Sequence, residues 1–246
     1  MEYDESTYGE RIADVYDELY ETLFDTEGAV EFLAALAEGG RALELGIGTG
    51  RIALPLKQRG VEVHGIDASE AMVEKLRAKP GGEEISITMG DFAETKAEGE
   101  FALVYIPFNT LFALTTREDQ VRCFHNAAER LNPEGKFVIE VFVPDPTRFN
   151  DHQRVSVERL GDEVVQLETS QHDPINQRVT SYHVFLSDGE PVRLYPVQIR
   201  YAWPSELDLM AELAGLRLRE RWGSWRRDKF TSESKFHISV YEKPTA

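Results

Sequence analysis

Three glycines that follow an acidic residue near position 45 have the character of a ligand-binding turn. Glu44 lies within an apolar run, and Gly46, Gly48 and Gly50 come directly after it. Glycine allows a positive φ and lets a ligand approach the backbone without a Cβ in the way. Residues 52–58 continue with helical spacing, and the free N–H groups at a helix start favour negatively polarised ligand atoms. The stretch predicts a buried strand, a tight turn and a helix, with a ligand at the turn.

Glycines after a strand are also typical of dinucleotide sites, but the spacing separates the two kinds of site. A dinucleotide fingerprint that starts at Gly46 requires a third glycine at position 51, where this chain has Arg51. Glu44-Leu45-Gly46-Ile47-Gly48-Thr49-Gly50 instead resembles motif I of the class I S-adenosylmethionine (SAM) dependent methyltransferases. The resemblance implies that the acid lies near the methionine end of SAM and that the glycine turn makes room for the cofactor. The cofactor-binding residues that it implies here are Glu44, Gly46, Ile47, Gly48, Gly50 and Arg51.

A second acidic residue, Asp67, ends the predicted strand 61–67 and follows Gly46 by 21 residues. A nucleoside-binding unit of this type has a carboxylate there that accepts hydrogen bonds from the ribose hydroxyls. Capping of the next helix is the alternative role for Asp67, although Ser69 is the better candidate for a cap. We therefore expect Asp67 to bind the ribose.

Gly90-Asp91-Phe92, which follows the predicted strand 85–89, resembles the adenine-edge motif of the same methyltransferases. In that family the Asp carboxylate accepts from the exocyclic amine of adenine. The 24 residues between Asp67 and Asp91 suit one more helix–strand unit. The further residues that the resemblance assigns to the cofactor are Ala68, Met72, Gly90, Asp91 and Phe92.

The segment after the predicted strand 101–106 is diagnostic of the subclass, because the family has it nearest the transferred methyl group. Adenine-N6 and glutamine methyltransferases have Asn/Asp-Pro-Pro-Tyr there, whereas this chain has Ile106-Pro107-Phe108-Asn109. The metal-dependent catechol type has an acidic residue there, and this segment contains none. We therefore expect neither subclass and no metal. Ile106 and Phe108 are assigned to the cofactor, and Phe108 and Asn109 to the acceptor.

Length and composition limit the class of protein further. With 246 residues, 41% of them hydrophobic, the chain can bury a full core. The net charge of −17 argues against a nucleic-acid substrate, because Lys and Arg neutralise the phosphates in such complexes. No apolar stretch approaches the ~20 residues of a membrane span, the acidic start lacks the regions of a signal peptide, and Cys123 is the single cysteine. We expect a cytoplasmic monomer or homodimer that binds no nucleic acid and no membrane.

The first 39 residues are expected to form a helical lid. Apolar residues at helical spacing predict one amphipathic helix that continues to Leu23, followed by a second helix over 27–37. In many small-molecule methyltransferases an N-terminal helix closes over the cofactor, and the resemblance implies that Tyr16 and Tyr20 face the sulfonium. A cation against an aromatic face gains on the order of 1 kcal/mol. Core packing is the alternative role for both tyrosines.

The pattern and the resemblance together predict an α/β fold, a Rossmann-like seven-stranded sheet with helices on both faces and an antiparallel β addition after the fifth strand. The strands expected in the large sheet are 41–45, 61–67, 85–89, 101–106, 136–143, 217–225 and 236–242, with helices at 52–58, 117–131 and 204–214. The added strands are 154–160, 163–170, 178–187 and 192–201. The expected domains are a lid (1–39), a SAM-binding domain (40–145 and 202–246) and an insertion (146–201) that covers the substrate side.

This layout resembles the small-molecule methyltransferases that include the aminosugar N,N-dimethyltransferases. The shared features are the pair Tyr16-Asp17, the added strands and an aromatic residue before the late helix, whereas a histidine of those enzymes is replaced by Ala113. We expect in-line transfer of the SAM methyl to an N or O atom of a small metabolite, with S-adenosyl-L-homocysteine (SAH) as product. A protein methyltransferase and a catalytically silent SAM-binding partner protein are the alternatives. The catalytic candidates are Tyr16, Asn109, His172 and Tyr201, and the acceptor-site candidates are Tyr20, Phe108, Asn109, Tyr201, Trp203 and Trp225.

Overall fold

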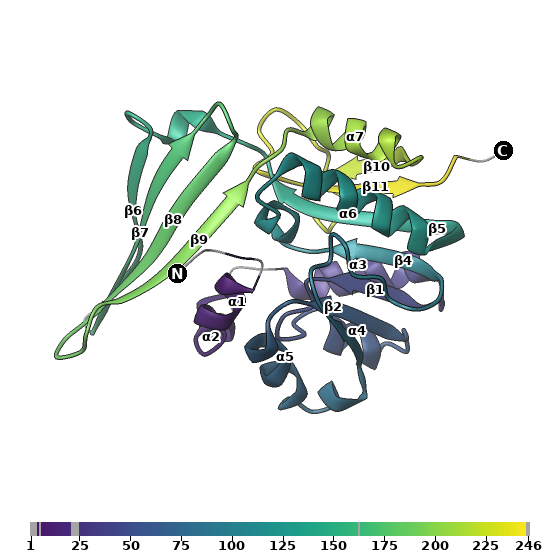
Figure 1. Cartoon of the computed structure of the whole chain (residues 1–246), viewed down its shortest axis with the longest axis horizontal. Coiled ribbons are helices and arrows are strands. Elements are labelled where there is room, and N and C mark those ends of the chain that lie inside the picture. The colour runs from purple at the N-terminus through teal and green to yellow at the C-terminus, as the bar shows by residue number, and fades with distance from the viewer. Residues whose placement is uncertain (1–3, 5, 21–24, 162, 245–246) are drawn as a thin grey trace.

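A computed structural model of the chain describes residues 4, 6–20, 25–161 and 163–244, which form two β-sheets (Figure 1). The strands of the large sheet are β1 (Ala42–Leu45), β2 (Val63–Asp67), β3 (Ser86–Met89), β4 (Phe101–Ile106), β5 (Leu131–Phe142), β10 (Arg217–Trp222) and β11 (Phe236–Glu242). Their order is β10-β11-β5-β4-β1-β2-β3, with β1 to β5 parallel and β11 antiparallel to both of its neighbours. The predicted seven-stranded sheet is confirmed.

Helices cover both faces of this sheet, as predicted (Figure 1). The helices α3 (Thr26–Ala37), α4 (Ala53–Gln58) and α5 (Glu70–Arg77) pack on one face, and α6 (Arg117–Arg130) and α7 (Pro204–Leu213) pack on the other. Because β1 and β4 are covered on both sides, their sequences read as nearly continuous apolar runs. The acidic exception within β1 is Glu44, which is only 2% exposed.

The N-terminal stretch differs from the single helix that its sequence predicts. It forms two short helices, α1 (Thr7–Ile12) and α2 (Tyr16–Tyr20), which are joined by a turn at residues 13–15. The turn lets the two halves contact different loops of the large domain, and such a break has no strong signal in the local sequence. Leu23, which the prediction included in the same helix, lies outside the described residues.

The strand β5 begins at Leu131, five residues before the start of the strand that the sequence predicts over 136–143. Phe101 of β4 pairs with Leu131, whereas Leu103 pairs with Lys136, so the intervening residues bulge out of β5. Proline at position 133 cannot donate a ladder hydrogen bond, which favours a bulge at this place. The predicted fifth strand is therefore confirmed in its place, but it starts earlier because it includes this bulge.

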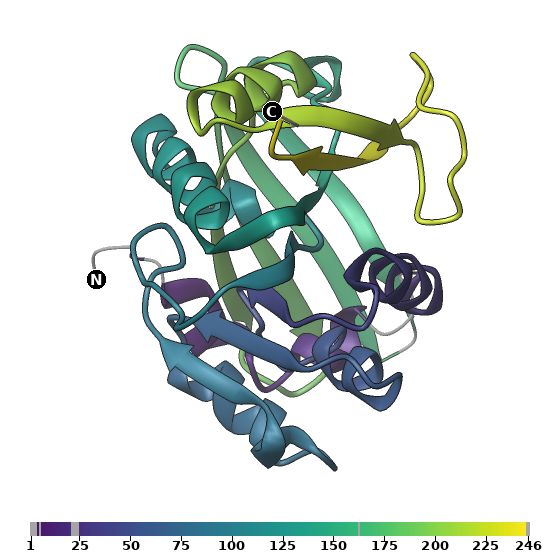
Figure 2. The ribbon, with the colours of Figure 1, turned by 90° about the vertical axis from the view of Figure 1, so that its right-hand side faces the viewer.

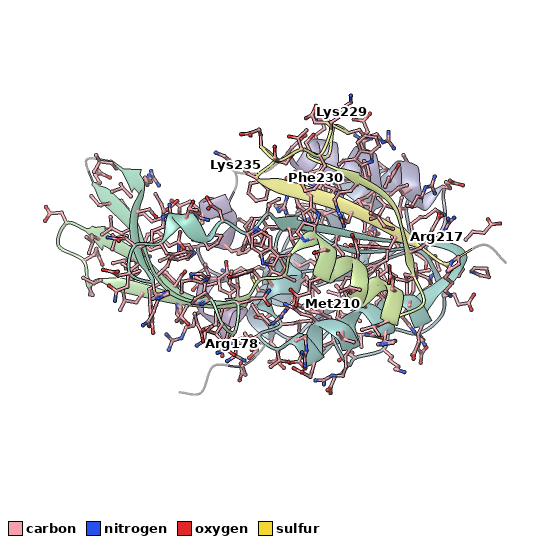
Figure 3. The ribbon with its side chains drawn as sticks, turned by 90° about the horizontal axis from the view of Figure 1, so that it is seen from above. Arg178, Met210, Arg217, Lys229, Phe230 and Lys235 are labelled. Carbon is pink, nitrogen blue, oxygen red and sulfur yellow. The ribbon has the colours of Figure 1, made fainter. Side chains whose placement is uncertain are left out.

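The first strand of the C-terminal hairpin ends at Trp222 and not, as predicted, at Trp225. The chain then turns toward α3, where the Trp225 ring packs edge-on against Phe32 with 5.5 Å between ring centroids. Figure 3 shows this loop, marked by Phe230, on the opposite side of the molecule from Met210 of α7. The hairpin therefore contributes to the α3 face of the sheet as well as to its edge.

The small sheet consists of β6 (Gln153–Leu160), β7 (Val164–Asp173), β8 (Arg178–Ser187) and β9 (Arg193–Arg200), antiparallel throughout and paired in that order. The predicted antiparallel addition after the fifth strand is confirmed. The sheet faces the carboxyl ends of the parallel strands (Figure 1) and lies behind the large sheet in Figure 2. Ligands of open α/β sheets bind at this edge, so the small sheet lies where it can enclose a ligand.

Candidate active site

A cavity of about 370 Å³ lies at the carboxyl edge of the large sheet. Its walls come from α1 and α2, from the loops after the parallel strands, and from the inner face of the small sheet. Pockets of roughly 300–1,000 Å³ are the usual size for small-molecule ligands. The cavity brings together these residues singled out in the sequence: Tyr16, Gly46, Gly48, Asp67, Ala68, Met72, Asp91, Phe92, Phe108, Asn109, His172 and Tyr201.

The glycine turn needs glycine at two positions for different reasons. Gly46 has φ +75°, and a Cβ there would lie 2.4 Å from Thr110 Cγ2, so no side chain fits. Gly48 has φ +55°, and a Cβ there would meet only Met72 Cε, at 3.9 Å. A side chain at position 48 would therefore extend into the cavity, which means that the glycine keeps a cradle open for a ligand.

Asp67, at the end of β2, lies beside this cradle and holds it in place. Its Oδ2 accepts from the Gly48 N–H (2.6 Å) and its Oδ1 accepts from the Ser69 N–H (2.9 Å). Burial raises the pKa of this carboxyl above its ordinary value. Each carboxylate oxygen has a second lone pair, so Asp67 can also accept from hydroxyl groups of a ligand. The cap of α5 is the Ser69 hydroxyl, which accepts from the Met72 N–H (3.2 Å), as the sequence favoured.

Glu44 lies beneath the glycine turn, where Tyr105 OH donates to its Oε2 at 2.8 Å. Burial raises the pKa of Glu44 from 4.5 to about 8, against the opposing effects of the Tyr105 hydrogen bond and the nearby Arg51 charge. Glu44 and Arg51 line a second, small pocket of about 20 Å³ that shares Gly46 with the large cavity. A buried carboxyl with a raised pKa gains from the approach of a cation, so this place suits an ammonium group.

Asp91 and Phe92 follow β3 and line the same cavity. The Asp91 Oδ1 accepts from the Ala93 N–H at 2.9 Å, which fixes the start of the loop. The Phe92 carbonyl accepts from Asn126 Nδ2 of α6 at 3.0 Å, so the loop is also held from below. The predicted adenine edge is therefore a rigid part of the cavity wall.

The Phe108-Asn109 turn adopts two consecutive left-handed conformations, with φ +46° and φ +38°. Strain of this kind persists only where the surroundings hold it, and here Glu140 of β5 does so. Glu140 Oε2 accepts from the Phe108 N–H (2.7 Å), its carbonyl accepts from the Asn109 N–H (2.9 Å), and its Oε1 accepts from Trp225 Nε1 (2.7 Å). The Asn109 Oδ1 accepts from the Phe142 N–H at 2.7 Å, so part of its hydrogen-bonding capacity serves the fold.

Glu140 supports the site but was not among the residues predicted from the sequence. Its side chain is buried, which raises the pKa of its carboxyl. The available signal was an acidic residue within the apolar run of residues 137–142. A buried carboxylate of this kind requires hydrogen-bond partners, and such a residue deserved a place among the site candidates.

The helices α1 and α2 are hydrogen-bonded to two loops of the large domain. Ser69 Oγ donates to Glu10 of α1 (2.8 Å), and Thr49 Oγ1 donates to Asp17 of α2 (2.6 Å). These two anchors explain the break at residues 13–15, because the two short helices run to different loops. Between the anchors, Tyr16 packs in one apolar cluster that also contains Met72 and Phe108.

His172 and Tyr201 lie on the small-sheet side of the cavity, with His172 Nε2 and Tyr201 OH 2.9 Å apart. The Phe149 ring stacks on His172 with 4.4 Å between centroids. Burial and the neighbouring His152 charge lower the pKa of His172, while burial raises the pKa of Tyr201. At neutral pH the imidazole is therefore an uncharged group that can accept a proton.

Several predicted residues lie away from the large cavity. Trp203 is 41% exposed just before α7, and Trp225 is buried against Phe32 and Glu140, so the geometry does not support acceptor contacts for either tryptophan. The side chain of Tyr20 lies outside the described part of the structure. Three of the remaining predicted residues line the small pocket: Glu44, Ile47 and Arg51. The other three lie outside both pockets: Gly50, Gly90 and Ile106.

The described residues contain neither a metal-binding cluster nor a membrane-spanning helix. In the described part of the chain, no three His, Cys, Asp or Glu side chains come close enough together to hold a metal ion. None of the helices in the described ranges is both long enough and apolar enough to cross a membrane.

Comparisons with known proteins show similarity to methyltransferases. A family profile described as "Methyltransferase domain" matches residues 42–135. The CcbJ methyltransferase from Streptomyces caelestis is similar over the whole chain, with 43% identity, a TM-score of 0.93 and coverage of 99% of this chain and 100% of that one. The Cypemycin N-terminal methyltransferase of a Streptomyces species is 27% identical over 247 residues, which cover 98% of this chain and 99% of that protein. The SAM-bound structure of CalS10, an amino pentose methyltransferase from Micromonospora echinaspora, has a TM-score of 0.68 at 18% identity, over 92% and 96% of the two chains.

Proposed function

The chain belongs to the class I SAM-dependent methyltransferases, and we propose that it transfers the methyl group of SAM to an amine nitrogen of a small metabolite. The observation that carries the proposal is the single cavity that joins Gly48 and Asp67 to His172 and Tyr201. A cofactor bound at the glycine turn and an acceptor bound against the small sheet would meet within it. The domain roles follow: residues 1–39 act as a lid, residues 40–145 and 202–246 bind SAM, and residues 146–201 enclose the acceptor.

The cofactor half of the cavity and the small pocket beside it fit SAM in their chemistry. Glu44 suits the ammonium of the methionine part, Asp67 suits the ribose hydroxyls, and Asp91 suits the adenine amine. The open cradle over Gly48 leaves room for the cofactor between these carboxylates. Two of the related proteins support nitrogen as the acceptor atom, since one is an N-terminal methyltransferase and the other is an amino pentose methyltransferase.

SAM supplies an electrophilic methyl group, and the protein mainly aligns the acceptor and excludes water. Tyr16 and Phe108 present apolar and aromatic surface to the cavity, which keeps it dry. An acceptor amine must be uncharged to attack, so its ammonium form has to lose a proton first. The neutral His172, hydrogen-bonded to Tyr201, is placed to accept that proton from an acceptor held against the small sheet.

The test is methyl transfer from SAM that carries a labelled methyl group to a panel of small amines, alcohols and short peptides. We expect label in N-methyl products together with release of SAH, and NMR of the products identifies the methylated atom. Loss of transfer in Asp67→Ala, with retained transfer in Asp188→Ala at the exposed tip of the β8–β9 turn, would tie the activity to the cavity. Label that appears only on oxygen, or only on peptides, would overturn the assignment to a small amine.

A further inference from the structure

The inner face of the small sheet carries a group of polar side chains that the methyl transfer does not use. On β7, Glu168 and Ser170 point into the cavity, and they lie directly opposite His183 and Ser181 of β8. Side chains two residues apart lie on the same face of a strand, so the four form one patch. We call these four residues the polar patch.

The hydrogen bonds within the polar patch fix the Glu168 carboxylate. Its Oε1 accepts from Ser170 Oγ (3.0 Å) and from Ser181 Oγ (3.1 Å), and the two serine oxygens lie 2.9 Å apart. Both serines are buried. On the other side, Arg154 Nη1 lies 3.9 Å from Oε2, which is too far for a good hydrogen bond but close enough to offset charge. Oε2 therefore keeps accepting capacity that faces the cavity.

His183 has an unmet requirement at the same place. Its ring lines the cavity, yet its buried Nδ1 has no hydrogen-bond partner among the described residues. Burial lowers the pKa of His183, so the ring is uncharged at neutral pH, with one nitrogen that donates and one that accepts. A buried polar atom left without a partner is costly, and a turn of the ring that brings Nδ1 to a ligand hydroxyl in the cavity would relieve that cost.

We propose that Glu168, Ser170, Ser181 and His183 form a subsite that binds hydroxyl groups of the acceptor, at a distance from the amine that is methylated. This inference rests on the proposed function, because it assumes that the acceptor occupies the cavity. One hydroxyl donates to Glu168 Oε2, and a neighbouring hydroxyl pairs with the ring of His183. A hydroxyl fits better than a second ammonium, because Arg154 already offsets the charge of Glu168 and an uncharged imidazole adds none. The acceptor class is thus a polyhydroxylated amine.

The experiment measures the binding of three ring amines to the enzyme saturated with SAH, by isothermal titration calorimetry. The probes are cyclohexylamine, the aminocyclitol scyllo-inosamine and cyclohexane-1,4-diamine, which share one six-membered ring. We expect the wild-type protein to bind the aminocyclitol at least about tenfold more tightly than cyclohexylamine, as one hydrogen bond to a charged group allows. Glu168→Gln should remove most of this preference, whereas Glu163→Gln, at an exposed position before β7, should keep it.

A second variant protects the test against misfolding of the first. His183→Phe keeps a ring of similar shape and removes both nitrogens, and it should lower aminocyclitol affinity by roughly threefold to tenfold without changing cyclohexylamine affinity. Equal affinity of the wild-type protein for cyclohexylamine and the aminocyclitol would overturn the proposal, and so would stronger binding of the diamine than of the aminocyclitol. Mass spectrometry scores N-methylation separately: probes that bind with the expected preference but gain no methyl group would count against the proposed function and not against the subsite.

Discussion

The replacement Glu44→Gln tests whether a protonated carboxyl beneath the glycine turn controls stability. The pKa of Glu44 is about 8 in the folded protein against an ordinary value of 4.5, because the side chain is buried. Between these two values the folded protein keeps a proton that the unfolded chain has released, so stability falls as the pH rises and the benefit is lost above about pH 8. One pKa unit corresponds to about 1.36 kcal/mol. Between about pH 6 and about pH 8.5, the free energy of unfolding of the wild-type protein should therefore fall by on the order of 3 kcal/mol relative to that of Glu44→Gln.

The assay is urea unfolding of the ligand-free protein at several pH values within that window, with the free energy of unfolding of each variant compared with wild type. Glutamine keeps the size of the side chain and an oxygen that can accept from Tyr105 OH, so the variant should fold. Glu74→Gln, at an exposed position on α5, is the matched control and should show no such pH dependence. A constant difference between wild type and Glu44→Gln across the window would refute the reasoning.

The same carboxyl predicts proton release on binding of SAM. If the ammonium of the cofactor approaches Glu44, the carboxyl becomes ionised, and at about pH 7 roughly 0.9 proton should leave the protein per SAM bound. Titration calorimetry in two buffers with different ionisation enthalpies measures this number directly. Glu44→Gln should release none.

Three further replacements test the geometry of the cavity. Asp67→Ala should weaken SAM binding by about 1–3 kcal/mol, because the Gly48 N–H and the ligand hydroxyls lose their acceptor, and calorimetry would measure it. The Glu140 carboxylate accepts from the Phe108 N–H and from Trp225 Nε1, and the glutamine of Glu140→Gln has only one oxygen for these two donors. The replacement should therefore cost about 1–3 kcal/mol of stability and lower the melting temperature and kcat together. Gly9→Ala would put a Cβ 2.5 Å from the Ser69 Cβ, so α1 has to move; KM for SAM should rise severalfold in steady-state assays, and an unchanged KM would argue against the lid.

The sequence was sufficient for those features that depend on neighbouring residues. The strand, the glycine turn and the helix after Glu44 follow one another along the chain, and Asp67 returns to Gly48 after one strand–helix–strand unit. The order and the hydrogen-bonding capacity of these residues could therefore be read directly. The antiparallel strands of the insertion were equally local, because alternation and turns define each of them.

The remaining features depend on partners that are far away in the chain. Glu140 bonds to Phe108 and Trp225, which lie 32 and 85 residues from it, so no local pattern reveals that it supports the positive-φ turn. The break between α1 and α2 depends on Ser69, which is 59 residues from Glu10. A tryptophan has the same signature in a core as in a pocket, and only the folded chain assigns Trp225 to the core.

The small sheet leaves the large one after β5 and rejoins it before α7, so its strands occupy one continuous stretch, residues 153–200. Replacement of this stretch as one block of the gene leaves Gly48, Asp67 and Asp91 unchanged, because all three come before it in the chain. Such an exchange has one condition. Val179 and Tyr201 belong to the same apolar cluster as Phe112, so a transplanted wall must match the surface at its base before it can offer a new acceptor site.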